Sequence, residues 1–337
     1  MSVSLHPSTV AVVSCSPDRL AALAELLPSK PPHWRYRYYS DPEQALRDIN
    51  TQKPPPVPLR QYAASPDGER LQLDLRHVHR DIYRAERLQE VAVAVVDADM
   101  PVGYLEWCDQ IRGPFVQRLA VGKDQQEEDV IHALDTGRLT QFVYANWNEA
   151  AQRLREMLQH AVERYCAAAS ASVKRVLTEA IPDTSVLDPF FIDFFQEKCQ
   201  ELKVAEYYPY GPELVFVLID VYGKRYALFA KTPDQLESDR HRVQADPLPD
   251  DVKHLLEKRA RMLCYPVNGD HDVPDSSEWG IYLQEPKELW GRRNYYAATR
   301  RDPFALDEDK DVEFFDPYTQ LSPRDAVKES SPSVDGT

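Results

Sequence analysis

Short apolar runs alternate with amphipathic stretches through the first 145 residues of the chain. The apolar runs that predict buried strands are Val10–Val13, Trp34–Tyr39, Val91–Val96, Phe115–Val121 and Gln141–Tyr144. Leucines at helical spacing after Pro17, a capped start at Ser40–Glu43, and segments near Leu105–Ile111 and Glu127–Leu134 predict the helices between them. Because strands and helices alternate, the pattern predicts an α/β fold: a doubly wound, five-stranded parallel sheet.

The run Val91–Val96 (VAVAVV) is the strongest strand signal, and it lacks polar alternation. A strand with no polar positions is typical of the interior of a parallel sheet, where helices cover both faces. The segment 51–90 interrupts the pattern with prolines at 54, 55, 56 and 58, so we interpret it as an insertion in this domain. Within it, the alternating leucines of 71–75 predict a strand and His79–Gln89 a short helix.

A long helical pattern follows from Asn146 to about Ile181, with apolar residues three or four positions apart and no Gly or Pro inside. A helix of about 35 residues is much longer than average. One interpretation is a single connecting helix over 146–183 that joins two domains and pairs with a second copy. The alternative is two helices with a break near Ser170–Ser172.

The remaining sequence predicts a smaller α+β domain over residues 184–318. Asp188-Pro189 opens an aromatic helix, and a turn at Val221–Lys224 joins two strands. The strands predicted here are Leu214–Asp220, Arg225–Phe229, Trp279–Leu283 and Asn294–Ala298, and a helix is predicted over Asp250–Met262. Residues 319–337, rich in Pro, Ser and acidic residues, are expected to be disordered.

Composition narrows the classes of function. Of the 337 residues, 55 are acidic and 40 basic, so the net charge is −15. This charge argues against a large nucleic-acid interface and against docking on anionic lipid. No run approaches the 18 or so apolar residues of a transmembrane helix, and the first residues do not resemble a signal peptide. Five scattered cysteines without CxxC spacing suggest reduced thiols, so we expect a cytoplasmic protein that contacts neither membrane nor nucleic acid.

A candidate site follows the central strand, because ligands of open parallel sheets bind beyond the carboxyl ends of the strands. The segment there reads Asp97-Ala-Asp-Met-Pro101. A strand, an Asp, and then Met and Pro three and four residues later resemble the phosphoacceptor segment of receiver domains in two-component response regulators. Gly122–Asp124 and Leu139–Val143 also match, and the resemblance covers residues 8–165. It implies a flavodoxin-like fold with Asp97 at the phosphoacceptor position.

The resemblance also implies a set of partners for Asp97 that this sequence lacks. Receivers hold Mg²⁺ with an acidic pair after the first strand, and those positions are Ser14 and Cys15 here. The hydroxyl position after the fourth strand is Val121, and the lysine position after the fifth is Ala145, followed by Asn146. We therefore predict a degenerate pseudo-receiver with no metal and no cofactor; Mg²⁺ would be needed only if phosphorylation survives.

Two further departures concern the loop after Asp97 and the supply of acids. The loop is one residue short, and the usual glycine is replaced at Tyr104. Asp18 and Asp99 are the only nearby acids that could substitute for the missing pair. Asp99 more often offers its backbone carbonyl in this family.

Other candidates have simpler explanations. His77 and His79 would share one side of a strand, but no third ligand is placed by sequence, so we interpret them as solvated. Asn268–Asp272 resembles a turn more than a calcium loop. Nothing suggests that Cys15 has the lowered pKa of a reactive thiol. Core packing explains most aromatics of the C-terminal domain, and Tyr207–Tyr210 or Trp290 would mark a ligand or partner surface only if they are exposed.

These observations lead to two hypotheses of different classes. The first is a response-regulator-like signalling protein whose non-phosphorylatable receiver acts through protein–protein interaction and homodimerisation. The dimer surface would lie at about Gln126–Tyr165, and a histidine kinase would be the donor if Asp97 is phosphorylated. The alternative is a receiver-regulated enzyme or small-molecule sensor with its site in the C-terminal domain, although no catalytic motif favours an enzyme.

Overall fold

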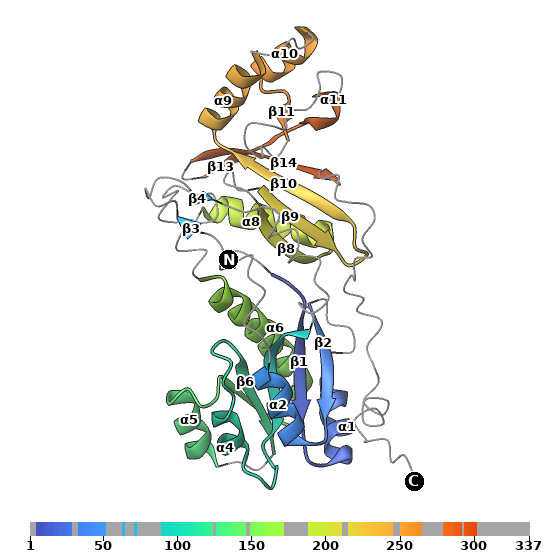
Figure 1. Cartoon of the computed structure of the whole chain (residues 1–337), viewed down its shortest axis with the longest axis vertical. Coiled ribbons are helices and arrows are strands. Elements are labelled where there is room, and N and C mark those ends of the chain that lie inside the picture. Colours follow the sequence, from blue (N-terminus) through green and yellow to red (C-terminus); the bar gives the residue numbers. More distant parts are fainter. Residues whose placement is uncertain are drawn as a thin grey trace.

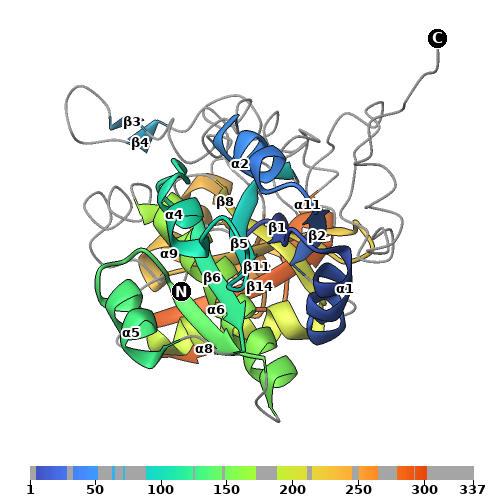
Figure 2. The same ribbon diagram turned by 90° about the horizontal axis from the view of Figure 1, so that it is seen from below.

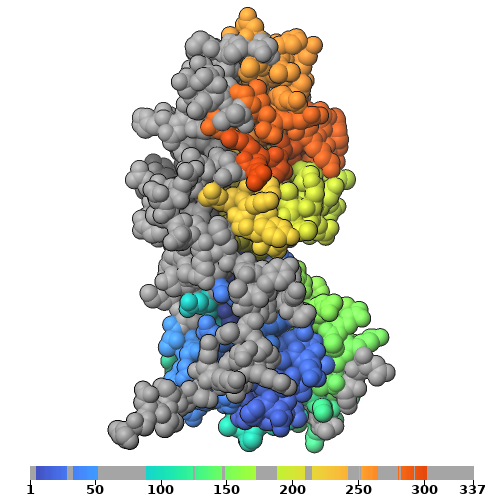
Figure 3. Space-filling model, turned by 90° about the vertical axis from the view of Figure 1, so that its right-hand side faces the viewer, coloured from blue at the N-terminus to red at the C-terminus, as the bar shows by residue number. Residues whose placement is uncertain are grey.

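The computed structural model consists of two modules stacked along the longest axis of the molecule (Figure 1). The structure describes residues 5–28, 33–51, 63–64, 71–72, 89–123, 126–145, 149–171, 188–210, 215–244, 250–264, 279–291 and 293–301. In the space-filling view, the blue and green lower module lies beneath the yellow to red upper one (Figure 3). The expected tail over 319–337 lies outside the described residues.

The lower module is built on a five-stranded, all-parallel sheet. Its strands are β1 (Ser8–Val13), β2 (Trp34–Tyr39), β5 (Val91–Asp97), β6 (Gln117–Gly122) and β7 (Gln141–Tyr144). They lie in the order β2-β1-β5-β6-β7. This is the flavodoxin-like strand order, so the predicted fold is confirmed. The small hairpin of β3 (Ala63–Ala64) and β4 (Leu71–Gln72) is the described part of the inserted segment.

Helices cover both faces of this sheet, and the view from below shows them around the strands (Figure 2). One face packs against α2 (Pro42–Thr51), α4 (Tyr104–Asp109) and α5 (Glu127–Asp135), through buried residues such as Ile49, Trp107 and Val130. The other packs against α1 (Pro17–Leu26) and α6 (Ala150–Ala169), through Leu20 and Leu158 among others. Every residue of β5 is buried, as its uninterrupted apolar run predicts.

The long helical pattern forms α6, which ends at Ala169 with Ser170 at its C-cap. Leu154, Leu158 and Val162 of α6 are fully buried in the core that also holds the lower sheet. This helix is therefore a structural layer of the receiver-like module as well as part of the connection between modules. Its end falls at the break near Ser170 that the two-helix interpretation proposes; residues 172–187 lie outside the described part of the chain.

The upper module contains an antiparallel sheet in the order β13-β14-β10-β9-β8. Its strands are β8 (Val204–Tyr210), β9 (Val215–Asp220), β10 (Arg225–Lys231), β13 (Lys287–Trp290) and β14 (Asn294–Arg301). Helix α8 (Pro189–Glu201) packs on the side that faces the lower module, and α9 (Pro233–Gln244) packs on the other. Asp188 caps α8 by accepting a hydrogen bond from the Phe190 N–H at 3.0 Å, as the sequence predicts.

Several predictions in this module are wrong or incomplete. The helix predicted over Asp250–Met262 ends earlier, as α10 (Asp250–Glu257), and Met262 lies in β11 (Met262–Leu263). The strand predicted over Trp279–Leu283 is instead a turn of helix, α11 (Trp279–Tyr282), followed by β12 (Leu283–Gln284), which pairs with β11. The elements missed are β8, β13 and α9. The sequence of β8 contains Pro209, and a proline argues against a strand. The sequence of α9 is too polar to show a clear apolar stripe.

The two modules share one hydrophobic core. A continuous cluster of buried residues includes Val10 and Leu158 of the lower module and Phe195, Tyr207 and Phe216 of the upper one. Backbone hydrogen bonds of 3.0 and 2.8 Å pair Leu5 with Tyr207 of β8, so the segment before β1 also extends the upper sheet. The modules therefore meet through packed apolar surface and paired backbone.

A buried ion pair fixes α9 on the upper sheet. Lys231 Nζ lies 2.6 Å from Asp239 Oδ2, and the side chains are only 2% and 5% exposed. Replacing Asp239 with alanine leaves an ammonium in the core without this carboxylate, so we expect a loss of about 3–5 kcal/mol in the free energy of unfolding. Urea denaturation followed by circular dichroism measures the loss. Glu237→Ala on the same helix removes a partly exposed pair with Arg240 and should cost less than about 1 kcal/mol; equal losses would contradict the prediction.

Candidate functional site

The candidate site lies where the strand order of the parallel sheet reverses, between the carboxyl ends of β1 and β5. Asp97 is the last residue of β5 and is 1% exposed. Ser14 follows β1 directly, and its hydroxyl donates a hydrogen bond of 2.8 Å to Asp97 Oδ2. In open parallel sheets this reversal point is the usual place for a ligand.

Arg19 reaches Asp97 from the first turn of α1. Ser16 is the N-cap of this helix and Pro17 its first residue, which places Arg19 at the third helical position. Its Nε lies 2.6 Å from Asp97 Oδ2 and its Nη2 lies 2.7 Å from Oδ1, so the guanidinium and carboxylate form a two-point pair. Arg19 Nη2 also pairs with Asp99.

The hydrogen bonds to Asp97 occupy both oxygens of its carboxylate. Oδ2 accepts from Arg19 and Ser14, and Oδ1 accepts from Arg19 and from the backbone N–H of Asp99 at 3.1 Å. A carboxylate has about four lone-pair positions, and four donors fill them here. This arrangement stabilises a carboxylate and leaves it little capacity to bind or attack another group.

The electrostatics of the pair follow from these contacts. Burial acts to raise the pKa of Asp97, but the hydrogen bonds from Arg19, Ser14 and the Asp99 backbone outweigh burial, and the pKa lies below its ordinary value. The hydrogen bond to Asp97 raises the pKa of Arg19. Both partners are therefore charged at neutral pH.

The other positions singled out from the sequence lie close to this pair. Cys15 is an exposed residue. Partial desolvation of its thiol, and then the negative charges of Asp97 and Asp41, raise the pKa of the thiol, so the thiol is not activated. Val121 is buried directly opposite Asp97 in the register of β5 and β6. Ala145, after β7, is half-buried, and Asn146 lies outside the described residues.

The loop after Asp97 places its glycine one residue earlier than the family pattern implies. Gly103 adopts a φ of 73°, in the left-handed region that favours glycine, and it immediately precedes α4. Tyr104, the first residue of α4, is buried.

Arg19 was not predicted as a partner of Asp97, because the partners expected from the resemblance are metal-binding acids. Of the two acids that could substitute for the missing pair, Asp18 is exposed, whereas Asp99 contacts Arg19. One signal was available: a basic residue in the first turn of a helix, where the helix dipole favours acids. Such a residue needs an anionic partner, and Asp97 supplies it.

Only some of the remaining candidate residues lie in the part of the chain that the structure describes. Tyr207 and Tyr208 are buried, which agrees with core packing and rules out a partner surface at these two, whereas Trp290 is 65% exposed. Among the described residues, no group of three or more His, Cys, Asp or Glu side chains is arranged to hold a metal. The pair His77 and His79 and the turn at 268–272 fall outside the described residues.

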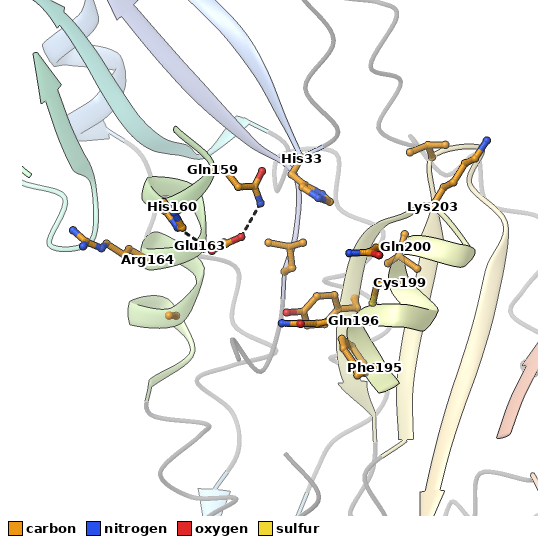
Figure 4. Close-up of a pocket in the computed structure, with 15 residues that line it drawn as sticks. His33, Gln159, His160, Glu163, Arg164, Phe195, Gln196, Cys199, Gln200 and Lys203 are labelled. Carbon is orange, nitrogen blue, oxygen red and sulfur yellow. Dashed lines mark hydrogen bonds and ion pairs between the residues drawn. The ribbon is translucent and has the colours of Figure 1, made fainter. Parts of the chain in front are cut away.

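A second concave region lies between the modules. A cavity of about 1180 Å³ separates α6 of the lower module from α8 of the upper one. The close-up in Figure 4 shows polar side chains from both helices around it. The alternative hypothesis expects a ligand site in the C-terminal domain, whereas about half of the residues that line this cavity belong to the receiver-like module.

Solved structures similar to this chain include one that matches nearly its full length and two that align with about half of it at TM-scores under 0.5. The chain is similar to the response regulator LqsR of Legionella pneumophila, with a TM-score of 0.70 and 19% sequence identity over 98% of this chain and 97% of that one. An adenylate cyclase from Rhodopirellula baltica (TM-score 0.33, 13% identity) aligns with 49% of this chain and 94% of its own. A response regulator receiver protein from Burkholderia phymatum (TM-score 0.29, 15% identity) aligns with 46% and 95%.

Comparison by sequence does not assign the chain to a family. No family model matches the chain, and no curated protein matches it. The match to LqsR, at 19% identity, supports the fold of this chain: a flavodoxin-like parallel sheet together with a second, antiparallel sheet. In the part of the chain that the structure describes, no helix combines the length and apolar character needed to span a membrane.

The lowered pKa of Asp97 predicts an acid-dependent stability. Its contribution is fully present above the pKa of the carboxyl in the unfolded chain, about 3.9, and is lost as the pH falls through the lower folded value. Asp97→Asn cannot ionise, so the stability difference between wild type and variant should shrink as the pH falls from 7 to 3. Urea unfolding at each pH measures this difference. Asp18→Asn, an exposed neighbour, is the control, and a difference that stays constant for Asp97→Asn would contradict the prediction.

Proposed function

We propose that this chain is a response-regulator-like signalling protein whose receiver module works without a metal and without phosphoryl transfer. The observation that carries the proposal is the two-point pair between Arg19 and Asp97, at 2.6 and 2.7 Å. The guanidinium supplies the positive charge that a divalent cation would supply beside an aspartate. The charge is part of the chain, so the site is complete at all times.

The residues around Asp97 do not fit Mg²⁺. The ion needs about six oxygen ligands in octahedral geometry, usually with one or two carboxylates. Ser14 uses its hydroxyl to donate to Asp97, and the carboxylates of Asp97 and Asp99 both contact Arg19. Val121 and Ala145 carry neither the hydroxyl nor the ammonium that would contact a bound phosphoryl group.

A receiver module of this kind would signal as a fixed platform. The pair ties α1 to the end of β5 and holds the loop that begins at Asp99. With no phosphoryl group to change this arrangement, the module would act through the proteins that it contacts. We propose a homodimer through the surface of α5 and α6, and Ile131 and Leu134 on α5 are the exposed apolar residues that support it.

The direct test is chemical. Incubation with acetyl phosphate and Mg²⁺, followed by intact-protein mass spectrometry, should give no phosphoryl adduct on the wild-type chain, while a phosphorylatable receiver in the same buffer is labelled. The reason is that the Asp97 oxygens are held by four donors. An adduct that disappears in Asp97→Asn would overturn the proposal and favour a histidine kinase as the donor.

Arg19→Ala makes the same test sharper. Without the guanidinium, Asp97 and Asp99 are both released, and Mg²⁺ should raise the melting temperature of this variant while leaving that of the wild type unchanged. Arg47→Ala is the matched control, because Arg47 pairs with the exposed acids Asp41 and Glu43 on another helix. A Mg²⁺-dependent rise in the wild type would argue against Arg19 as the resident cation.

The dimer surface has its own test. Light scattering after gel filtration should give twice the chain mass, and Leu134→Asp should shift the protein towards monomer, because a buried carboxylate disfavours an apolar contact. Leu255→Asp on α10 is the control, since the two leucines are 37% and 36% exposed. A monomeric wild type, or equal effects of the two variants, would remove the dimer from the proposal.

A further inference from the structure

The cavity between the modules has an apolar floor and polar walls. Leu5, Phe195, Val204 and Tyr207 form the floor, and all four are buried. The walls come from α6 on one side and α8 on the other, as Figure 4 shows. Cavities at the junction of two modules, with an apolar lining and a few polar groups, are the usual form of a small-molecule site.

A carboxylate is held in place on the α6 wall. Glu163 Oε1 accepts a hydrogen bond of 2.8 Å from Gln159 Nε2, and its other oxygen lies 3.6 Å from His160 Nδ1. Figure 4 shows these contacts and the Glu163 side chain directed towards the cavity. Gln159 therefore orients an acceptor with lone pairs to spare.

A second acceptor comes from His33, at the start of β2. Its Nδ1 lies 3.1 Å from the carbonyl oxygen of Ala205, which can only accept, so Nδ1 carries the proton and Nε2 has a free lone pair. Burial lowers the pKa of His33, against the opposing effects of the Ala205 carbonyl and the Glu163 charge. The ring is therefore neutral at pH 7 and offers an acceptor.

The two permanent cations of the lining point elsewhere. Figure 4 shows the side chain of Arg164 directed away from the cavity and that of Lys203 at its far end. Lys203 Nζ lies 5.9 Å from the centre of the Tyr222 ring, in cation–π contact. Gln196 and Gln200 on α8 complete the polar wall with carboxamides that both donate and accept.

We propose that this cavity binds a small organic amine with an apolar body. The ammonium group would donate to Glu163 and the apolar body would lie on the floor formed by Leu5, Phe195, Val204 and Tyr207. The acceptors that face the cavity require a ligand rich in donors, and the buried floor requires apolar surface. A ligand in contact with α6 and α8 at once favours the arrangement in which these helices face each other.

The experiment uses the full chain and four primary amines of increasing apolar size: butylamine, octylamine, 2-phenylethylamine and tryptamine. Isothermal titration calorimetry at pH 7 should show saturable binding of at least one of them. The uncharged analogue of the best binder, with a hydroxyl in place of the amine, and its carboxylate analogue should bind at least about tenfold more weakly, since the charge-assisted hydrogen bond to Glu163 is lost.

Two variants on α6 decide whether the site is the one described. Glu163→Gln should weaken the binding of the amine by at least about tenfold. Glu156→Gln should leave binding unchanged: Glu156 accepts from Gln152 at 3.0 Å in the same four-residue spacing, but lies outside the cavity. No binding of any amine, equal binding of the carboxylate analogue, or equal weakening by both variants would overturn the proposal. None of these outcomes bears on the state of Asp97.

Discussion

The receiver-like module depends on how one buried negative charge is neutralised. Asp97 lies at the end of a strand that is buried along its whole length, and a lone carboxylate there would be costly. Arg19 removes this cost with a two-point pair, and Ser14 and the Asp99 backbone complete its hydrogen bonds. Because the cation is a side chain, its position also determines how α1 lies on the sheet. The same ion pair therefore neutralises Asp97 and fixes the position of α1.

The same constraint supports the proposal that the receiver-like module works without a metal. In a site built for a divalent ion, several acids must be kept close together, and their repulsion is relieved only when the ion binds. Here Arg19, a permanent cation, pairs with both Asp97 and Asp99. Under the proposed function, the positive charge at this site does not depend on ion concentration, and the oxygens of Asp97 are already held by hydrogen bonds.

The junction between the two modules is held by hydrogen bonds and by a shared apolar core. Leu5 forms backbone hydrogen bonds with Tyr207, and the His33 ring forms a hydrogen bond with the Ala205 carbonyl. The apolar core continues from the lower sheet into the upper module. The cavity between α6 and α8 interrupts this junction beside its tightest contacts. A ligand there would act on an interface that is already largely formed, so small differences in contact could bias the arrangement of the modules.

The sequence by itself determined the parallel sheet and its helices, because apolar runs such as Val91–Val96 and helix caps such as Ser16 act locally. It also placed Ser14, Cys15, Val121 and Ala145 at the positions where the resemblance to receiver domains implies an acidic pair, a hydroxyl and a lysine. Only the tertiary structure decided that Arg19 reaches Asp97, 78 residues away, and that Glu163 and His33 face one cavity. Such pairings depend on which elements pack together, and no spacing along the chain records them.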